Sequence, residues 1–430
     1  MASRRQTSGP LLLRDFRLLW IGETSTKLGT GVTSVVLPLI AVTTLNATPF
    51  QIGLLSAAAW LPWLLVSLPA GAWVDRLRRH PIMLTCDATS LVVLASIPFA
   101  AWADTLTTTH LIVAAFLGGL SAVLFTTAYR AYVPTLVDSH DLVAANAALQ
   151  GGEQAAQITG RGLGGLLAQL LGPAVALLVD VASFAVSAAC LLTIRKREPR
   201  PVRAGNKTGV GREIIEGLRF TTGDPYLRPL TLFGALGNLA FAALQTLLVV
   251  FLVRDVGVSS MLVGVVLAST SVGGVVGAVA ARPTARRFGT ARGLLLWAMG
   301  TAPFALLIPL TTPGAGLVLA VIGVFVIGAG LVAATVIIIS FRQTYCPPHL
   351  LGRVGASTQF LNYGAIPLGT LATGAFATAV GTRAALWGVA AVFLLYGIIL
   401  FAGRLRRHRD LPTMPPVHDD TPHSPTGSKA

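Results

Sequence analysis

Apolar segments of similar length recur along this chain of 430 residues, and short polar breaks separate them. Each segment is close to the roughly 20 apolar residues that an α-helix needs to cross a bilayer, whereas a membrane β-barrel shows shorter segments of alternating polarity. The pattern therefore predicts twelve membrane-spanning helices, over residues 18–43, 51–74, 82–103, 110–134, 147–171, 174–194, 228–253, 260–282, 292–311, 315–341, 355–379 and 384–403.

The composition agrees with a membrane protein, because 53% of the residues are hydrophobic and only 11% are charged. Soluble domains carry about 25% charged residues, so the composition excludes an ordinary soluble enzyme. The cysteines Cys86, Cys190 and Cys346 stand singly, without the spacing of a metal site or a disulfide framework. The histidines lie in loops, helix ends or the tail, and no P-loop sequence is present. We therefore expect no enzymatic activity, no metal and no cofactor.

The net charge of +15 is distributed unevenly over the breaks. If the N-terminus is cytoplasmic, the breaks on the outer side contain only Arg254 and Arg383, and the other loop arginines and lysines lie inside. This asymmetry predicts a multi-pass protein of the plasma membrane with both termini in the cytoplasm. It also accounts for the basic charge, so we expect no nucleic-acid partner.

The longest internal break, 195–227, is rich in Arg, Gly and Pro and divides the predicted helices into two sets of six. We therefore expect a cytoplasmic N-terminus (1–17), a first half (18–194), a linker (195–227), a second half (228–403) and a disordered tail (404–430). An internal repeat at an offset of 209 supports the two halves, because Gly160, Gly165 and Gly172 align with Gly369, Gly374 and Gly381. Such repeats are typical of transporters whose site lies between the repeats.

One motif follows the second predicted helix: Gly71-Ala72-Trp73-Val74-Asp75-Arg76-Leu77-Arg78-Arg79. It resembles the signature between helices two and three of the major facilitator superfamily. Further stretches, 15–20, 48–55, 132–137 and 180–184, resemble the subfamily of enterobactin exporters and macrolide efflux pumps. The resemblance covers residues 12–403. In the second half the motif has no aspartate, since Gly277 leads only to Ala281 and Arg282.

The resemblance implies an all-helical major facilitator fold, with twelve helices in two pseudo-symmetric halves around a central cavity. It implies a monomeric secondary transporter that exports a small organic molecule, such as a drug, antibiotic or siderophore, by proton antiport. Two alternatives remain open: an uptake symporter of the same fold, and a non-transporting membrane sensor or scaffold. The motif residues expected to form a conformational latch are Gly71, Asp75, Arg76 and Arg79, with Arg130 as a partner for Asp75.

Six ionisable residues lie inside the predicted spans, all in the first half: Glu23, Lys27, Asp87, Glu153, Arg161 and Asp180. A charge at the centre of a membrane helix costs about 2.5–3.5 kcal/mol or more, so each is a functional candidate. For Asp87 and Asp180 we favour structural pairing.

Four of these residues are candidates for proton coupling or substrate binding. Glu23 and Lys27 share a helix face at the i, i+4 spacing, and Glu153 follows two glycines in a stretch rich in Gln. A self-neutralising ion pair at Glu23, or a packing contact at Glu153, would explain the same pattern. Arg161 stands where antiporters of this fold often have proline, and adds a cation for Glu153 or for an anionic substrate. Eight residues of helix, about 12 Å, separate it from Glu153, which argues against a direct ion pair.

Polar and aromatic residues on the expected cavity helices are candidates for binding an amphipathic molecule through stacking and a few hydrogen bonds. They are Thr24, Asn238, Gln245, Gln359, Asn362 and Tyr363, and Trp60 and Trp63 on the second predicted helix add to them. Each of these residues would equally suit a contact between helices.

Overall fold

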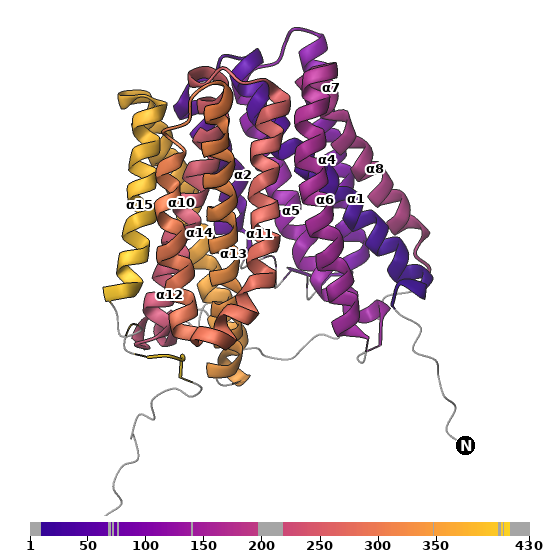
Figure 1. Ribbon diagram of the computed structural model, residues 1–430. Helices are drawn as coiled ribbons and strands as arrows, with labels where there is room; N and C mark the ends of the chain where they lie inside the picture. The colour runs from indigo at the N-terminus through magenta and orange to yellow at the C-terminus, as the bar shows by residue number, and fades with distance from the viewer. Residues whose placement is uncertain are drawn as a thin grey trace, which may run out of the picture.

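A computed structural model describes residues 10–67, 70, 73–74, 77–138, 141–196, 218–346, 348–402, 406 and 408–412. Within these ranges every regular element is a helix (Figure 1). A helix pairs its backbone N–H and C=O groups internally, as the hydrocarbon core of a membrane requires. Ten helical segments of the described chain are long and apolar enough to cross a bilayer, so this is a multi-pass membrane protein.

Helices occupy all six predicted spans of the first half. They are α1 (Arg14–Leu39) with the π-helical turn η2 (Ile40–Thr44), α2 (Pro49–Leu65), α4 (Arg79–Trp102), α5 (Thr108–Leu136), α6 (Leu142–Leu171), and α7 (Pro173–Ala176) followed by α8 (Leu178–Thr193). Two of them are not among the ten spanning segments. α2 is apolar but short over its described residues. α6 has the length to cross, but its glutamines and its two charged residues reduce its hydropathy.

Helices also occupy the six predicted spans of the second half. They are α10 (Leu227–Val250) with the π-helical turn η3 (Phe251–Asp255), α11 (Ser260–Phe288), α12 (Thr290–Thr301) with the 3-10 helix η4 (Ala302–Leu307), α13 (Leu317–Tyr345), α14 (Pro348–Val380) and α15 (Thr382–Ala402). The span predicted as one helix over 292–311 differs from this expectation. Its α-helix ends at Thr301, next to Pro303, which has no N–H to continue the ladder.

The two halves repeat each other in detail. The first helix of each half ends in one π-helical turn, η2 in the first and η3 in the second. The repeat-related glycines Gly172 and Gly381 both follow a long helix and both have a positive φ, +86° and +89°. Glycine adopts this conformation without steric cost. The internal repeat in the sequence therefore corresponds to a repeated chain path.

Contacts between helices define the two halves and the seams that join them. α1 packs on α6 and α8 in the first half, and α11 packs on α13 in the second. The main contacts between halves are those of α6 with α11 and of α2 with α14. We call the end of the bundle where α1 begins the terminal end, and the opposite end the distal end. Figure 1 shows the halves together at the distal end and diverging toward the terminal end.

Arginines gather at the terminal end of the helices. The described ones there include Arg14, Arg17, Arg79, Arg282, Arg286, Arg287, Arg292 and Arg342, whereas Arg254 and Arg383 lie at the distal end. Most of the predicted linker 195–227 and most of the predicted tail 404–430 lie outside the described residues.

Candidate functional site

The site is organised by α6, which has a polar face and a small-residue face. Gln150, Glu153, Gln154, Gln157 and Arg161 recur at intervals of three and four, so they form one stripe along the helix. We call these five residues the polar stripe. Gln150 and Gln154 are exposed, and the other three are half-buried. A stripe of this polarity does not suit lipid, so it belongs on the interior of the bundle.

An adjacent face of α6, formed by small residues, packs closely on α1. A Cβ at Gly152 would lie 2.8 Å from the hydroxyl oxygen of Thr24, and one at Gly160 would lie 3.0 Å from the Cα of Gly31. The Trp20 indole N–H donates to the Ala148 carbonyl at 2.9 Å and ties the two helices together. The polar stripe borders this face, where Glu153 reaches Lys27 of α1, and it faces the second half at Arg161, which bonds to α11.

The distal part of that same direction is filled by α11. A Cβ at Gly165 would lie only 2.7 Å from the Cα of Gly264, so the two helices touch through their backbones. Toward the terminal end the halves diverge (Figure 1). The stripe residues from Gln157 to Gln150 therefore lie on the part of α6 where the halves separate, and Gln150 and Gln154 are exposed there.

An ion triad stands at the edge of the stripe. The Lys27 ammonium lies 3.4 Å from Glu23 Oε1 and 3.3 Å from Glu153 Oε1, so one cation of α1 bridges two carboxylates on two helices. The side chains are 24% (Lys27), 9% (Glu23) and 30% (Glu153) exposed. With all three groups ionised, the triad carries one excess negative charge.

The second oxygen of Glu23 is the least satisfied atom of the triad. Glu23 Oε2 is buried and accepts no hydrogen bond from the described residues, and neither does the nearby Thr26 hydroxyl oxygen. A buried carboxylate without full pairing is costly. A proton on this carboxyl removes that cost and also removes the excess charge.

Arg161 does not join the triad. Its Nη1 donates to Ser271 Oγ at 2.8 Å and to the Leu267 carbonyl at 3.4 Å, both on α11. The residue therefore connects the two halves, and it leaves Glu153 to Lys27.

A second seam, between α2 and α14, mirrors the first. A Cβ at Gly53 would lie 3.1 Å from the Cα of Gly374, which is the repeat partner of Gly165. At the distal end the Phe50 N–H donates to Thr378 Oγ1 at 3.1 Å. The repeat thus places backbone contacts through glycine at both seams, toward the distal end of the bundle.

Three aromatic rings meet on the second seam. Tyr363 of α14 lies 5.5 Å from Trp60 and 5.4 Å from Trp63 of α2, and the two indoles are 6.3 Å apart. All three rings are half-buried. They provide a stacking surface that both halves share.

The polar candidates of the second half are spread over α10 and α14. The Asn362 amide packs against Gly234 of α10, whose carbonyl accepts from Asn238 Nδ2 at 2.8 Å. Asn362 Oδ1 and Gln245 Oε1 are buried without a partner among the described residues. Gln359 is half-buried on α14, one turn from Asn362. These groups have hydrogen-bonding capacity that the fold leaves unused.

The acids on the peripheral helices have different surroundings. Asp180 of α8 is buried and accepts hydrogen bonds from Thr33 of α1 and from Ser183, the latter at 3.0 Å. Asp87 of α4 is also buried, beside Ser187 of α8. Both acids lie where helices pack together, away from the polar stripe.

The predicted latch falls mostly outside the described chain. Gly71, Asp75 and Arg76 are not among the described residues, so the expected pairing of Asp75 with Arg130 stays a prediction. Arg79 begins α4 and is half-buried, and Arg130 is exposed on α5.

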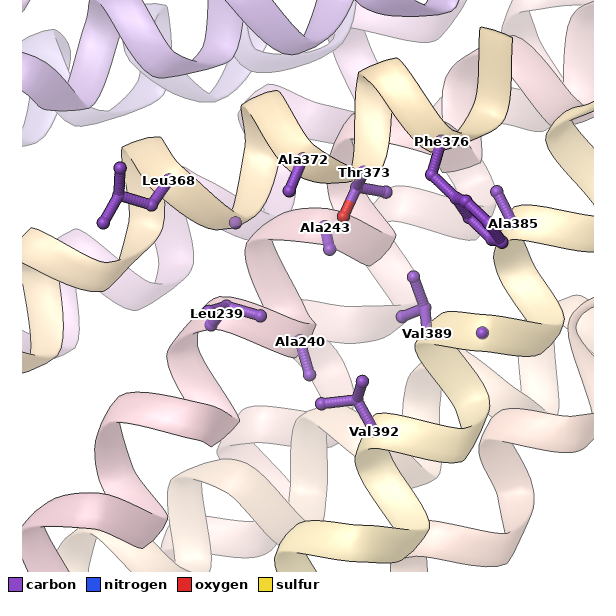
Figure 2. A pocket seen from close by; sticks show the side chains of 12 residues that line it. Leu239, Ala240, Ala243, Leu368, Ala372, Thr373, Phe376, Ala385, Val389 and Val392 are labelled. Atoms are coloured by element: carbon purple, nitrogen blue, oxygen red, sulfur yellow. The ribbon is translucent and has the colours of Figure 1, made fainter. Parts of the chain in front are cut away.

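An apolar pocket among the described residues lies apart from this site. It has a volume of about 470 Å³ and lies between α10, α14 and α15. Figure 2 shows apolar side chains around it, including the ring of Phe376, with the Thr373 hydroxyl as the single oxygen among the labelled residues. Leu368 (68%) and Phe376 (51%) at its border are strongly exposed, as expected for a crevice that faces lipid.

Sequence reasoning identified the charged members of the site but missed several neutral ones. The missed residues are the stripe glutamines Gln150, Gln154 and Gln157. Their spacing of three and four residues from Glu153 and Arg161 could have predicted that they share one helix face with those charges. Ser271 had no such signal, because only the packing of α6 on α11 brings it to Arg161.

Comparisons with known proteins agree with this architecture. Residues 6–424 match the family described as transmembrane secretion effector. The chain is 29% identical, over 405 residues, to the multidrug efflux pump Tap of Mycolicibacterium fortuitum, covering 93% of this chain and 97% of that protein.

Solved structures show the same fold at low sequence identity. The nucleoside transporter NupG superimposes with a TM-score of 0.75 at 13% identity, covering 92% of this chain and 99% of that one. A bacterial homologue of the iron transporter ferroportin, solved in an inward-facing state, gives a TM-score of 0.71 at 17% identity over 91% of this chain and 98% of that one.

Proposed function

The chain belongs to the transmembrane secretion effector family of major facilitator transporters, and we propose that it exports a small organic molecule in exchange for protons. The similarity to a multidrug efflux pump supports export of a drug-like compound. The observation that carries the proton-exchange proposal is the ion triad of Glu23, Lys27 and Glu153.

The triad supports exchange through its charge. Two carboxylates share one ammonium, so the site attracts either a proton or a cationic group of the cargo. Once a proton has bound, the triad is neutral and its attraction for a cation is lost. Proton and cargo therefore bind alternately. Each ligand shifts the protein toward the conformation that binds it more tightly.

The topology supports loading from the cytoplasm. We place the terminal end in the cytoplasm because the arginines gather there. The seams at Gly165 and Gly53 close the distal end, and the halves diverge toward the terminal end. In this arrangement the polar stripe is reached from the cytoplasm, and rocking of the halves would open it to the outside.

The test is a flux measurement with purified protein in liposomes, with rhodamine B as the fluorescent probe. An antiporter accumulates the dye in liposomes whose lumen is acidic, and a protonophore abolishes the accumulation. A symporter moves the dye in the opposite direction, and a sensor gives no protein-dependent flux. Either of these outcomes contradicts the proposal.

Two variants test the triad itself. Glu23→Gln and Glu153→Gln each remove one proton-binding carboxyl, so we expect gradient-driven accumulation to fall by about 5- to 150-fold, the range that corresponds to a coupling free energy of about 1–3 kcal/mol between two ligands. The control is Asp104→Asn, in the turn between α4 and α5, where φ is +54° and asparagine is tolerated. Unchanged gradient-driven flux in Glu23→Gln would remove Glu23 from the mechanism.

A further inference from the structure

Arg161 is a cation near the middle of α6 that the triad does not use. It lies eight residues distal to Glu153 on the same polar stripe, a rise of about 12 Å. Its Nη1 reaches across the seam to Ser271 Oγ and to the Leu267 carbonyl of α11. Both acceptors are neutral, so the positive charge of the guanidinium is not balanced by them.

No carboxylate in the described part of the chain pairs with Arg161. The acids on the helices packed around it, Glu23, Glu153 and Asp180, have other partners on α1 or α8. An arginine at this depth is costly unless it finds a counter-charge or water. A bound molecule that brings a negative charge would supply the missing partner.

The Arg161 guanidinium also has hydrogen-bond donors that the fold does not use. Nε and Nη2 of Arg161 make no hydrogen bond among the described residues, and neither atom is sealed from solvent. Arginine presents its N–H groups as a planar fork that matches the two oxygens of a carboxylate, sulfonate or phosphate group. Arg161 itself is half-buried on the polar stripe, one turn distal to Gln157.

We propose that Arg161 is an anion-binding subsite of the cargo cavity, and that the cargo is an amphipathic zwitterion. Its anionic group binds Arg161, its cationic group takes the excess negative charge of the triad about 12 Å away, and its apolar body lies between them. This inference rests on the proposed function in one respect, since it treats the space between the halves as the binding site.

The proposal gives Arg161 a role in coupling as well. When the fork turns to an anionic group, its bonds to Ser271 and Leu267 weaken, and these bonds join the halves at the distal seam. Cargo binding thereby favours the state in which the distal end is open. The same side chain would therefore bind the anionic group and weaken the contact between the halves at the distal seam.

The test measures binding, so that it stands apart from proton-driven flux. The probes are rhodamine B, which has a free carboxylate beside its cationic ring system, and rhodamine B ethyl ester, which lacks that negative charge. Fluorescence anisotropy gives the affinity of each dye for the protein in nanodiscs, with empty nanodiscs as the blank. A hydrogen bond to a charged group corresponds to about ten- to a hundredfold in affinity.

We expect the wild-type protein to bind rhodamine B at least about tenfold more tightly than the ester. Arg161→Gln should abolish this preference by weakening only rhodamine B. Arg161→Lys keeps a cation and should retain part of the preference. The matched control, Ser271→Ala, removes the bond across the seam but leaves the guanidinium in place, so it should retain the full preference.

Three results would overturn the proposal. The first is equal binding of the two dyes to the wild-type protein. The second is an equal loss for both dyes in Arg161→Gln and Ser271→Ala, which would make Arg161 a structural tie alone. The third is absence of binding by either dye. A carboxylate preference that depends on Arg161, in a protein without proton-driven flux, would instead support the subsite and contradict the proposed antiport.

Discussion

Single glycine residues set how closely the helices of the first half approach each other. Gly29 of α1 faces Asp180 and Ser183 of α8 so closely that a Cβ would collide with both side chains. These are the two residues whose hydrogen bond holds the buried Asp180 carboxylate. The absence of a side chain at Gly29 therefore allows a buried acid to sit between two helices. Gly118 of α5 has open space around it and serves no such purpose.

Adding one methyl group at each of these positions separates the two cases. We expect Gly29→Ala to destabilise the protein by about 1–3 kcal/mol, because the packed site has no room for it. Gly118→Ala should be neutral or slightly stabilising, because alanine favours a helix by up to about 1 kcal/mol over glycine. Thermal unfolding in detergent measures both. Equal melting temperatures for the two variants would contradict this account of the α1–α8 contact.

Among the elements, α6 connects most of the functional features. One face packs on α1, an adjacent face holds the polar stripe, and the distal part meets α11. The sequence predicted a span at 147–171 and identified Glu153 and Arg161, because charges in an apolar run are conspicuous. It did not predict that α6 begins at Leu142, or that Gln150, Gln154 and Gln157 belong to the same stripe as the charges.

The contact of α6 with α11 gives a prediction at this scale. Gly165→Ala places a Cβ 2.7 Å from the Gly264 backbone, so it should destabilise the distally closed state by about 1–3 kcal/mol. A coupling change of that size is about 5–150-fold, and we expect export to fall accordingly. Gly162→Ala, on the same helix with open space around it, is the control and should export normally. A normal rate in Gly165→Ala would show that the close contact is dispensable.

The whole molecule is two similar halves held together at one end. The seams of α6 with α11 and α2 with α14 are related by the internal repeat, and both involve glycine near the distal end. Because the halves diverge toward the terminal end (Figure 1), the arrangement resembles a wedge that is open on the side rich in arginine. Alternating access also requires a second conformation, in which the terminal end is closed and the distal end is open.

Cross-linking tests this arrangement. In a background with Cys86, Cys190 and Cys346 replaced by alanine, Phe50→Cys with Thr378→Cys should form a cross-link across the closed distal end and stop transport until a reductant is added, because a hydrogen bond from the Phe50 N–H to Thr378 Oγ1 joins α2 and α14 at this point. A second pair is Thr135→Cys with Thr344→Cys, on the terminal ends of α5 and α13, and these two threonines are repeat partners of each other. This pair should cross-link poorly, because the halves diverge at the terminal end. Efficient cross-linking of the terminal pair alone would place the resting protein in the opposite state.

The sequence by itself determined the helical architecture, the repeat and the residues that carry charge into the bilayer. These properties depend on local composition, because the length of an apolar run and the positions of arginines are visible without any partner. The confirmed predictions are the fold and the resemblance to the family. The pairing of Asp75 with Arg130 stays a prediction.

Only the tertiary structure decided which side chains meet. Lys27 bridges acids on α1 and α6, Arg161 bonds to Ser271 on α11, and Tyr363 packs on Trp60 of α2. Each of these contacts joins residues that are far apart in the sequence. It depends on which helices pack together and at what rotation, and small residues such as Gly160 and Gly165 set that packing through backbone contact. The chemical character of the site therefore depends on single residues, whereas its geometry depends on how the helices pack at the seams.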